Sequence, residues 1–163
     1  MNPKAQLGFG LGLGGSIGDL LVPIIMFAIL AFIAYPAYIE FRAVARVTEG
    51  IGSVATAKAA IEKAFVAKGP ADMSRIAVTG WTAPAPTEHI QLAAIGKDGS
   101  ITLLFAESVA PKGQNDVQIV PVSGGKAVDL SLAVNAGRKF EWQCGGPAGK
   151  TTLPEKFRPK NCR

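Results

Sequence analysis

The first strong pattern along the chain is an uninterrupted apolar segment. Leu20–Ile39 contains twenty consecutive uncharged and mostly apolar residues, whereas every later apolar stretch is short and broken by charges or glycine. About twenty such residues span the hydrocarbon core of a bilayer when they form a helix. The pattern therefore predicts a helix whose surface faces lipid or other apolar helices.

Beyond Pro36 the pattern becomes that of an amphipathic helix. Apolar residues recur at steps of three and four, with charged residues largely between them, at Val47, Ile51, Val54, Ile61 and Phe65. We expect one helix from about Ile17 to Val66, roughly 75 Å long, whose second half packs by one face. Lys68-Gly69-Pro70 ends it. Pro36 lies inside the helix and predicts a bend or a weak point.

The period then changes to short alternating runs that are typical of strands. A Pro- and Thr-containing connection comes first, and Asp98-Gly99 and Gly124-Gly125 supply turns between the runs. The predicted strands are Ile90–Ile95, Ile101–Phe105, Val117–Val122, Val128–Val134 and Lys139–Cys144. Four or five antiparallel strands with one apolar face would bury the stripe of the helix, which predicts an α+β fold.

The N-terminal segment has the composition of a leader. Met1–Gly14 holds a single charged side chain, Lys4, and too many glycines for a stable helix. A conventional secretory signal would have its cleavage site after the apolar run, but here the run continues as a helix, which favours processing near Gly14-Gly15. The glycine spacing also satisfies the dinucleotide fingerprint GxGxxG, but that motif requires a preceding strand and a βαβ unit, which the surrounding residues do not supply.

The cysteines and the single histidine limit the chemistry. Cys144 and Cys162 are the only cysteines, an even count that suits one disulfide in an oxidising compartment. Their spacing resembles no zinc site, and His89 is far away in sequence. His89 also has no partners at a catalytic spacing. We therefore expect neither a metal site nor catalysis.

Positive charge is concentrated at the C-terminal end. The chain has a net charge of +5, and its last fourteen residues carry one acidic residue, Glu155, against five cations, namely Lys150, Lys156, Arg158, Lys160 and Arg163. Two interpretations remain open. The cations form an ordinary solvated face, or they contact an anionic surface or a nucleic acid.

Asp19 stands at the start of the apolar run and also has two interpretations. It interacts with the positive end of its own helix, or it needs a cationic partner in an apolar environment.

Both ends of the chain resemble those of the type IV pilins. The segment Gly14–Val22 is similar to the prepilin processing site, in which a peptidase cuts after a glycine and leaves an acidic residue fifth in the mature chain. If Gly15 is first, then Asp19 is fifth, Pro36 is twenty-second and Tyr38 is twenty-fourth. The family characteristically has an acid, a proline and an aromatic residue at these places.

Further matches lie along the helix and at the C-terminus. Val47-Thr48-Glu49 resembles the Val-Ser/Thr-Glu triplet of the pilin helix. Trp142-Gln-Cys144 and Thr152–Arg163 are similar to the type IVa pilin ending, a Trp-X-Cys strand and a disulfide loop that finishes in Pro-X-X-Cys-Arg. The resemblance implies a Cys144–Cys162 disulfide and a pilin fold in which the C-terminal half of a long helix packs on a sheet. The implied segments are a leader (1–14), a membrane and filament-core helix (15–39), an amphipathic half-helix (40–68), an αβ-loop (69–89), a sheet (90–143) and a disulfide loop (144–163).

The resemblance also implies a function. Such a chain is the major structural subunit of a type IV pilus, which serves adhesion, twitching motility and DNA uptake; it is no enzyme and binds no cofactor. Cleavage would fall between Gly14 and Gly15, with N-methylation, and Gly15, Asp19 and Pro36 would serve assembly. The implied partners are other pilin subunits, prepilin peptidase, the assembly platform and its ATPases, and the inner membrane before export to an extracellular filament; DNA or a host surface is a further partner.

Three other functions compete with the major pilin. The chain could be a minor pilin or a type II secretion pseudopilin, although the disulfide-loop ending favours the pilus. It could be a competence pilin whose basic loop captures DNA. More remotely, it could be a bitopic membrane protein with a periplasmic binding domain that does not polymerise.

Overall fold

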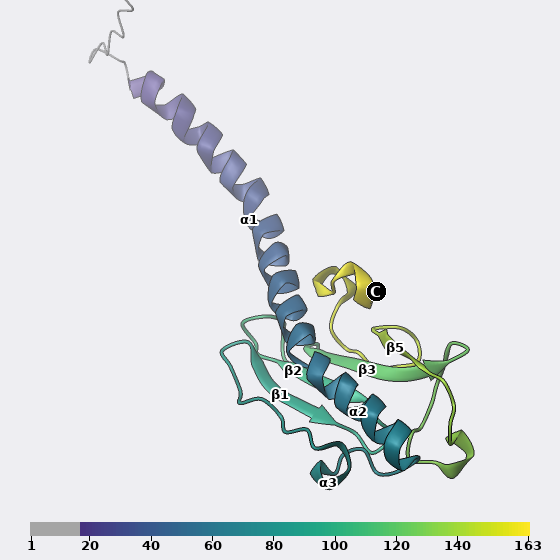
Figure 1. The fold of residues 1–163 in the computed structure, drawn as a ribbon. Coiled ribbons are helices and arrows are strands. Elements are labelled where there is room, and N and C mark those ends of the chain that lie inside the picture. The colour runs from purple at the N-terminus through teal and green to yellow at the C-terminus, as the bar shows by residue number, and fades with distance from the viewer. Residues whose placement is uncertain (1–16) are drawn as a thin grey trace, which may run out of the picture. The chain divides into compact units, whose positions relative to one another are not determined.

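A computed structural model describes the backbone of residues 17–163 and the side chains from Leu20 onward. The chain divides into two compact units, Met1–Tyr38 and Ile39–Arg163. Helix α1 (Ile17–Ser53) extends from the first unit into the second and is followed by α2 (Ala55–Lys68) (Figure 1). Helix α2 ends where Lys68-Gly69-Pro70 predicts, and Gly69 caps it by donating its N–H to the Phe65 carbonyl at 3.0 Å.

The predicted long helix is confirmed over Leu20–Lys68, with one irregular residue, Val54, that separates α1 from α2. Val54 has φ −97° and ψ 11°, outside the helical range. The residues before it favour a break, because glycine is a poor helix former and the Ser53 hydroxyl donates to the Gly50 carbonyl at 2.7 Å. The chain remains helical through both Pro23 and Pro36.

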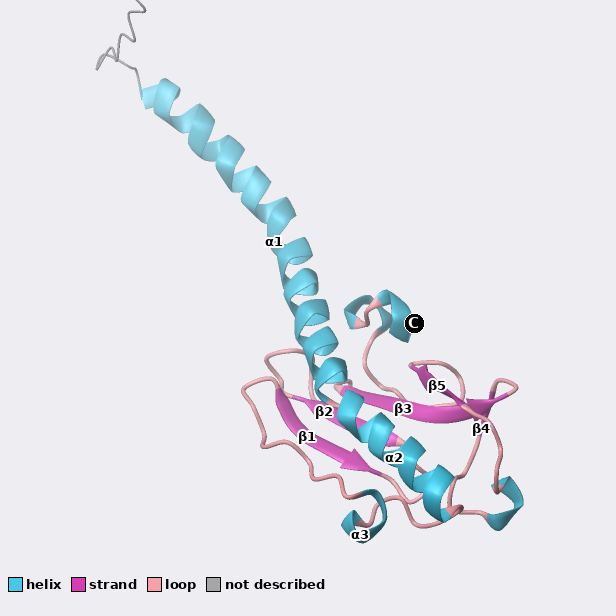
Figure 2. Cartoon of the chain, in the orientation of Figure 1, coloured by secondary structure: helices cyan, strands magenta, loops and turns pink. Residues whose placement is uncertain are grey.

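The second unit contains a five-stranded antiparallel sheet, as predicted (Figure 2). Its strands are β1 (Ile90–Ile95), β2 (Ile101–Phe105), β3 (Asp116–Ser123), β4 (Lys126–Ala127) and β5 (Glu141–Cys144). The order is β1-β2-β3-β4, and β5 also pairs with β3. The strand β1 is therefore one edge of the sheet, and β5 lies on the other side of β3 from β2.

The β1–β2 hairpin forms around the predicted Asp98-Gly99 turn. Gly99 has φ 86°, a conformation that glycine adopts without strain. The Asp98 carboxylate accepts hydrogen bonds from the Ser100 amide at 3.0 Å and from its hydroxyl at 2.7 Å. Local side-chain bonding of this kind is what makes an Asp-Gly pair a strong turn signal.

The predicted strand Val128–Val134 is wrong. Strand β4 ends at Ala127, and the following residues form a turn and a short 3-10 helix, η1 (Ala133–Asn135). Val128 and Leu130 are buried and alternate with partly exposed residues, which imitates a strand. The Asp129 carboxylate instead accepts from the Ser131 amide at 2.9 Å and from its hydroxyl at 2.6 Å, and such local bonds compete with pairing between strands.

The apolar stripe of the helices forms one buried cluster with the sheet and the C-terminal segment. Of the predicted stripe, Val47, Val54, Ile61 and Phe65 are buried and Ile51 is partly buried. The stripe also contains three buried alanines that were not predicted, Ala43, Ala57 and Ala64. The cluster adds buried residues of β2 and β3, among them Ile101, Leu103, Phe105, Val117 and Ile119, and residues near the C-terminus, Leu153 and Cys162.

The connection between α2 and β1 contains a short helix, α3 (Ile76–Thr79), that the sequence does not predict. Lys68, the last residue of α2, donates from Nζ to the carbonyls of Ala77 and Val78, both at 2.8 Å. This lysine therefore joins the end of α2 to the connecting segment.

Candidate functional site

The described part of the first unit is an exposed apolar helix. Every side chain from Leu20 to Ile39 is exposed within the chain, including the large residues Phe27, Phe32 and Tyr35. The described residues hold one helix long and apolar enough to cross a membrane, and none of its apolar window is buried. An apolar surface of this extent is unfavourable in water.

The predicted processing and pairing residues lie at the edge of what the structure describes. Gly14 and Gly15 are outside the described residues, and Asp19 is described only as part of the α1 backbone. Pro36 lies inside α1. Cleavage after Gly14 and pairing of Asp19 therefore stay predictions.

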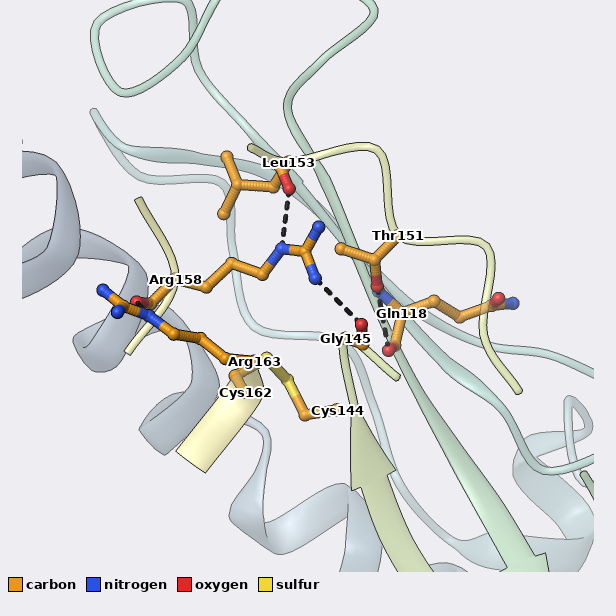
Figure 3. The surroundings of a disulfide bond; sticks show 8 residues. All are labelled: Gln118, Cys144, Gly145, Thr151, Leu153, Arg158, Cys162 and Arg163. Atoms are coloured by element: carbon orange, nitrogen blue, oxygen red, sulfur yellow. Dashed lines mark hydrogen bonds between the residues drawn. A yellow bond between two sulfur atoms is a disulfide. The ribbon is translucent and has the colours of Figure 1, made fainter. Parts of the chain in front are cut away.

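The C-terminal segment is closed by a disulfide between Cys144, the last residue of β5, and Cys162 in the short 3-10 helix η3 (Lys160–Cys162) (Figure 3). The two Cα atoms are 4.6 Å apart, within the range that a disulfide allows. This bond confirms the predicted cysteine pair. The segment it closes, residues 144–162, is called the disulfide loop below.

The Arg158 side chain forms hydrogen bonds with two backbone carbonyls of the disulfide loop. Its Nε donates to the Leu153 carbonyl at 2.7 Å, and its Nη1 donates to the Gly145 carbonyl at 2.8 Å (Figure 3). Gly145 has φ 72°, and a Cβ there would collide with the Cys162 carbonyl oxygen. Arg158 therefore stabilises the closed loop, and Gly145 allows the backbone to approach Cys162 closely.

The disulfide loop also covers the part of β3 that β5 leaves unpaired. The Thr151 hydroxyl accepts from the Gln118 amide at 3.0 Å and donates to the Gln118 carbonyl at 3.3 Å. The Thr152 hydroxyl accepts from the Asp116 amide at 3.1 Å, and the Leu153 amide donates to the Asp116 carbonyl at 3.0 Å. These bonds replace strand pairing and satisfy backbone groups that a free sheet edge would expose.

The structure separates the five predicted C-terminal cations into different roles. Arg158 is half-buried and committed to the carbonyls of the loop. Lys156 lies 3.8 Å from the Glu40 carboxylate, and both side chains are largely exposed. Lys150 and Lys160 are exposed, as is Arg163, whose Nε donates to the Arg158 carbonyl at 3.1 Å. An external anion could therefore reach Lys150 and Lys160 most directly.

The single histidine is not part of a cluster. His89 precedes β1 and is partly buried, and its Nδ1 has no hydrogen-bond partner among the described residues. Within residues 20–163 no group of three or more His, Cys, Asp or Glu side chains could hold a metal ion.

Sequence reasoning missed a second group of side chains, on the face formed by α2 and β5. The rings of Phe65, Phe140 and Trp142 form two edge-to-face contacts, with centroids 5.7 Å and 5.5 Å apart. The Trp142 indole N–H donates to the Glu62 carboxylate at 2.6 Å. The Trp-X-Cys ending draws attention to Trp142, but no local signal names its partner, because 80 residues separate the two.

Comparisons with known proteins agree with this architecture. A family model for pilins, described as a bacterial filament family, matches residues 43–163. The fimbrial protein EcpC of Eikenella corrodens is 28% identical to this chain over 152 residues, covering 92% of this chain and 90% of that protein. A type IV pilin of Pseudomonas aeruginosa aligns with a TM-score of 0.54 and 18% identity, over 74% of this chain and 97% of that chain.

A long apolar helix, an antiparallel sheet packed on helices and a C-terminal disulfide together define the type IV pilin fold. Pilins with this fold are structural subunits of bacterial filaments. Since the family model covers most of the sequence, the chain belongs to the pilin family.

Proposed function

We propose that this chain is the major structural subunit of a type IV pilus that serves adhesion, twitching motility and DNA uptake. The observation that supports it most is the exposed, uncharged surface of α1 from Leu20 to Ile39. The precursor stores this surface in the inner membrane, with the second unit outside. Assembly into the extracellular filament then replaces lipid with neighbouring helices, an exchange that is nearly neutral in hydrophobic terms.

Assembly begins with removal of the leader. Prepilin peptidase cuts between Gly14 and Gly15, and the new amino group is then methylated. Support comes from the counting of residues, because only this cut places Asp19, Pro36 and Tyr38 at the family's positions. Force for assembly comes from ATPases that act through a membrane platform, which this chain does not encode.

Register within the filament comes from a polar contact. Asp19 pairs with the free amine of Gly15 on a neighbouring subunit. Between Met1 and Ile39 Asp19 is the only acidic residue. Both groups are costly to bury alone in an apolar environment, and a missing partner leaves a penalty of several kcal/mol. The surrounding apolar helices pack equally well in several registers, so this pair selects one of them.

Electron microscopy and intact mass of sheared surface filaments test the proposal. We expect filaments whose dominant protein has the mass of a chain that begins at Gly15. Asp19→Asn should stop filament formation while processed subunit accumulates in the membrane, and the matched control Asp19→Glu should assemble. A trace amount of the chain in filaments built from another subunit would identify a minor pilin instead. Normal filaments from Asp19→Asn would remove the pairing role.

A further inference from the structure

The end of α2 and the segment that leads into β5 lie side by side in the second unit (Figure 1). Their side chains line a groove. Its volume is about 540 Å³, and one side is open to solvent. We call it the α2–β5 groove. It is lined by Glu62, Phe65, Val66, Gly69, Gly137, Arg138, Lys139 and Phe140. Its size is that of a small-molecule site, which is commonly apolar with a few polar groups.

The apolar part of the groove is largely aromatic. Phe65 belongs to the core and is 5% exposed, and its ring meets Phe140 edge to face at 5.7 Å. Phe140 in turn contacts Trp142 at 5.5 Å. Val66 is 86% exposed at the groove and makes an apolar rim. A ring or a short alkyl chain placed here would lose part of its contact with water.

The lining of the groove is positive on balance, because it holds two cations, Arg138 and Lys139, against one carboxylate, Glu62. Glu62 accepts the Trp142 N–H at 2.6 Å, and it interacts electrostatically with Lys58, which stands over the Trp142 ring at 6.0 Å. Arg138 and Lys139 are exposed, and neither side chain makes a hydrogen bond or an ion pair with any described residue. Two uncommitted cations therefore border an apolar surface.

We propose that the α2–β5 groove binds a small amphiphilic anion, a carboxylate that carries an aromatic ring or a short alkyl chain. The apolar body lies against Phe65, Phe140 and Val66, and the carboxylate meets Arg138 and Lys139. Arginine and lysine differ in the contact they make, since the guanidinium accommodates both carboxylate oxygens and the ammonium acts as a point charge. Binding is independent of filament assembly, so this inference does not rest on the proposed function.

Fluorine NMR of 3-(4-fluorophenyl)propanoate with the full chain in non-ionic detergent measures this binding, with empty micelles as the baseline. The dissociation constant should be on the order of a millimolar, as for a small ligand in an open groove. The uncharged amide of the same compound should bind about fivefold more weakly. Added salt should weaken binding of the carboxylate and leave the amide unaffected.

Paired variants locate the site. Val66→Asp should weaken binding of the carboxylate by fivefold or more, because it removes the apolar rim and repels the anion. Ile76→Asp also replaces an exposed β-branched apolar residue by aspartate, but outside the groove, and should alter binding by less than twofold. Arg138→Gln with Lys139→Gln should weaken binding about fivefold, whereas Lys97→Gln with Lys112→Gln, which removes equal charge elsewhere, should not.

Three results would overturn the proposal. The first is that 3-(4-fluorophenyl)propanoate binds no more tightly than its uncharged amide. The second is equal loss in the groove variants and their controls, which would indicate general electrostatic or micelle effects. The third is a chain that binds no carboxylate but self-associates in a manner that Val66→Asp abolishes, which would make the groove an interface between copies of this chain.

Discussion

Trp142 on β5 donates its indole N–H to the carboxylate of Glu62 on α2, at 2.6 Å and across 80 residues of sequence. This bond fastens the last strand of the sheet to the helix that crosses the sheet. Trp142→Phe keeps the ring near Phe140 but removes the donor, so it should lower the free energy of unfolding by about 1 kcal/mol. Urea unfolding of the full chain in detergent, monitored by circular dichroism, measures the change. Equal loss in Trp142→Phe made in a Glu62→Ala background, which has no acceptor, would show that the bond itself contributes nothing.

The same glutamate also affects the pKa of Lys58, against a larger effect of burial. Burial lowers the pKa of Lys58 below its ordinary value of 10.5, and the nearby Glu62 carboxylate raises it in part. Glu62→Gln should therefore lower the pKa of Lys58 further. Carbon NMR of the lysine Cε shifts during a pH titration measures this pKa, and Glu107→Gln, which removes one carboxylate elsewhere, is the control. A pKa of Lys58 that is unchanged in Glu62→Gln would contradict the assigned interaction.

The sign of the stability effect follows from the lowered pKa of Lys58. Between the folded pKa and 10.5 the unfolded chain binds more protons at this lysine than the folded chain does. The free energy of unfolding should therefore rise with pH across that window. Because Glu62→Gln lowers the folded pKa of Lys58 further, the pH range over which the free energy of unfolding rises should extend to lower pH in this variant.

The sequence predicts most of the fold because its strongest patterns are local. The apolar stripe indicates the buried face of the helix, and Asp98-Gly99 places the hairpin with both strand bounds correct. An error arises where a local bond competes with a pattern. Asp129 turns the chain at a place where alternation indicates a strand. The Ser53 hydroxyl bonds to the Gly50 carbonyl just before Val54, where the helical backbone is irregular although the apolar stripe continues.

The candidate sites are predictable only where a motif marks them. The Trp-X-Cys and Pro-X-X-Cys-Arg patterns locate the disulfide, which the structure contains. The role of Arg158 could not be predicted, because a cation in a basic segment has the same sequence signature whether it faces solvent or bonds to carbonyls. The α2–β5 groove combines residues from two distant segments, and no periodicity relates them.

Gly50 and Gly52 offer a matched pair on α1. A Cβ on Gly50 would lie 2.6 Å and 2.8 Å from two ring carbons of Phe105, a fully buried residue of β2, whereas a Cβ on Gly52 would meet nothing within 4 Å. Gly50→Ala should lower the free energy of unfolding by about 1–3 kcal/mol through overpacking. Gly52→Ala should raise it by about 0.5–1 kcal/mol, because alanine is the better helix former.

Thermal or urea unfolding of both glycine variants tests the close approach of helix and strand. Phe105→Leu provides space for the new methyl group, so Gly50→Ala should cost less in that background. Equal stability of Gly50→Ala and Gly52→Ala would mean that α1 does not pack this closely on β2.

The cations of the disulfide loop provide the last prediction, since the structure divides them into one that holds the loop and others that face solvent. If the loop retains DNA, the contact is electrostatic, independent of sequence and weakened by salt. Lys150→Gln, Lys156→Gln and Lys160→Gln together should then reduce DNA retention at low salt while the free energy of unfolding stays within about 0.5 kcal/mol. Arg158→Gln removes one charge but also leaves two carbonyls without a donor.

Arg158→Gln should therefore lower the free energy of unfolding by about 1–3 kcal/mol, and Arg158→Lys should not restore it, because an ammonium lacks the two separated donors that reach Leu153 and Gly145. The measurement pairs urea unfolding with DNA retention by the assembled filaments at two salt concentrations. If the triple lysine variant retains as much DNA as the unmodified chain, these lysines do not bind DNA and serve only as solubilising charges. A stable Arg158→Gln variant would show that the disulfide alone holds the loop closed.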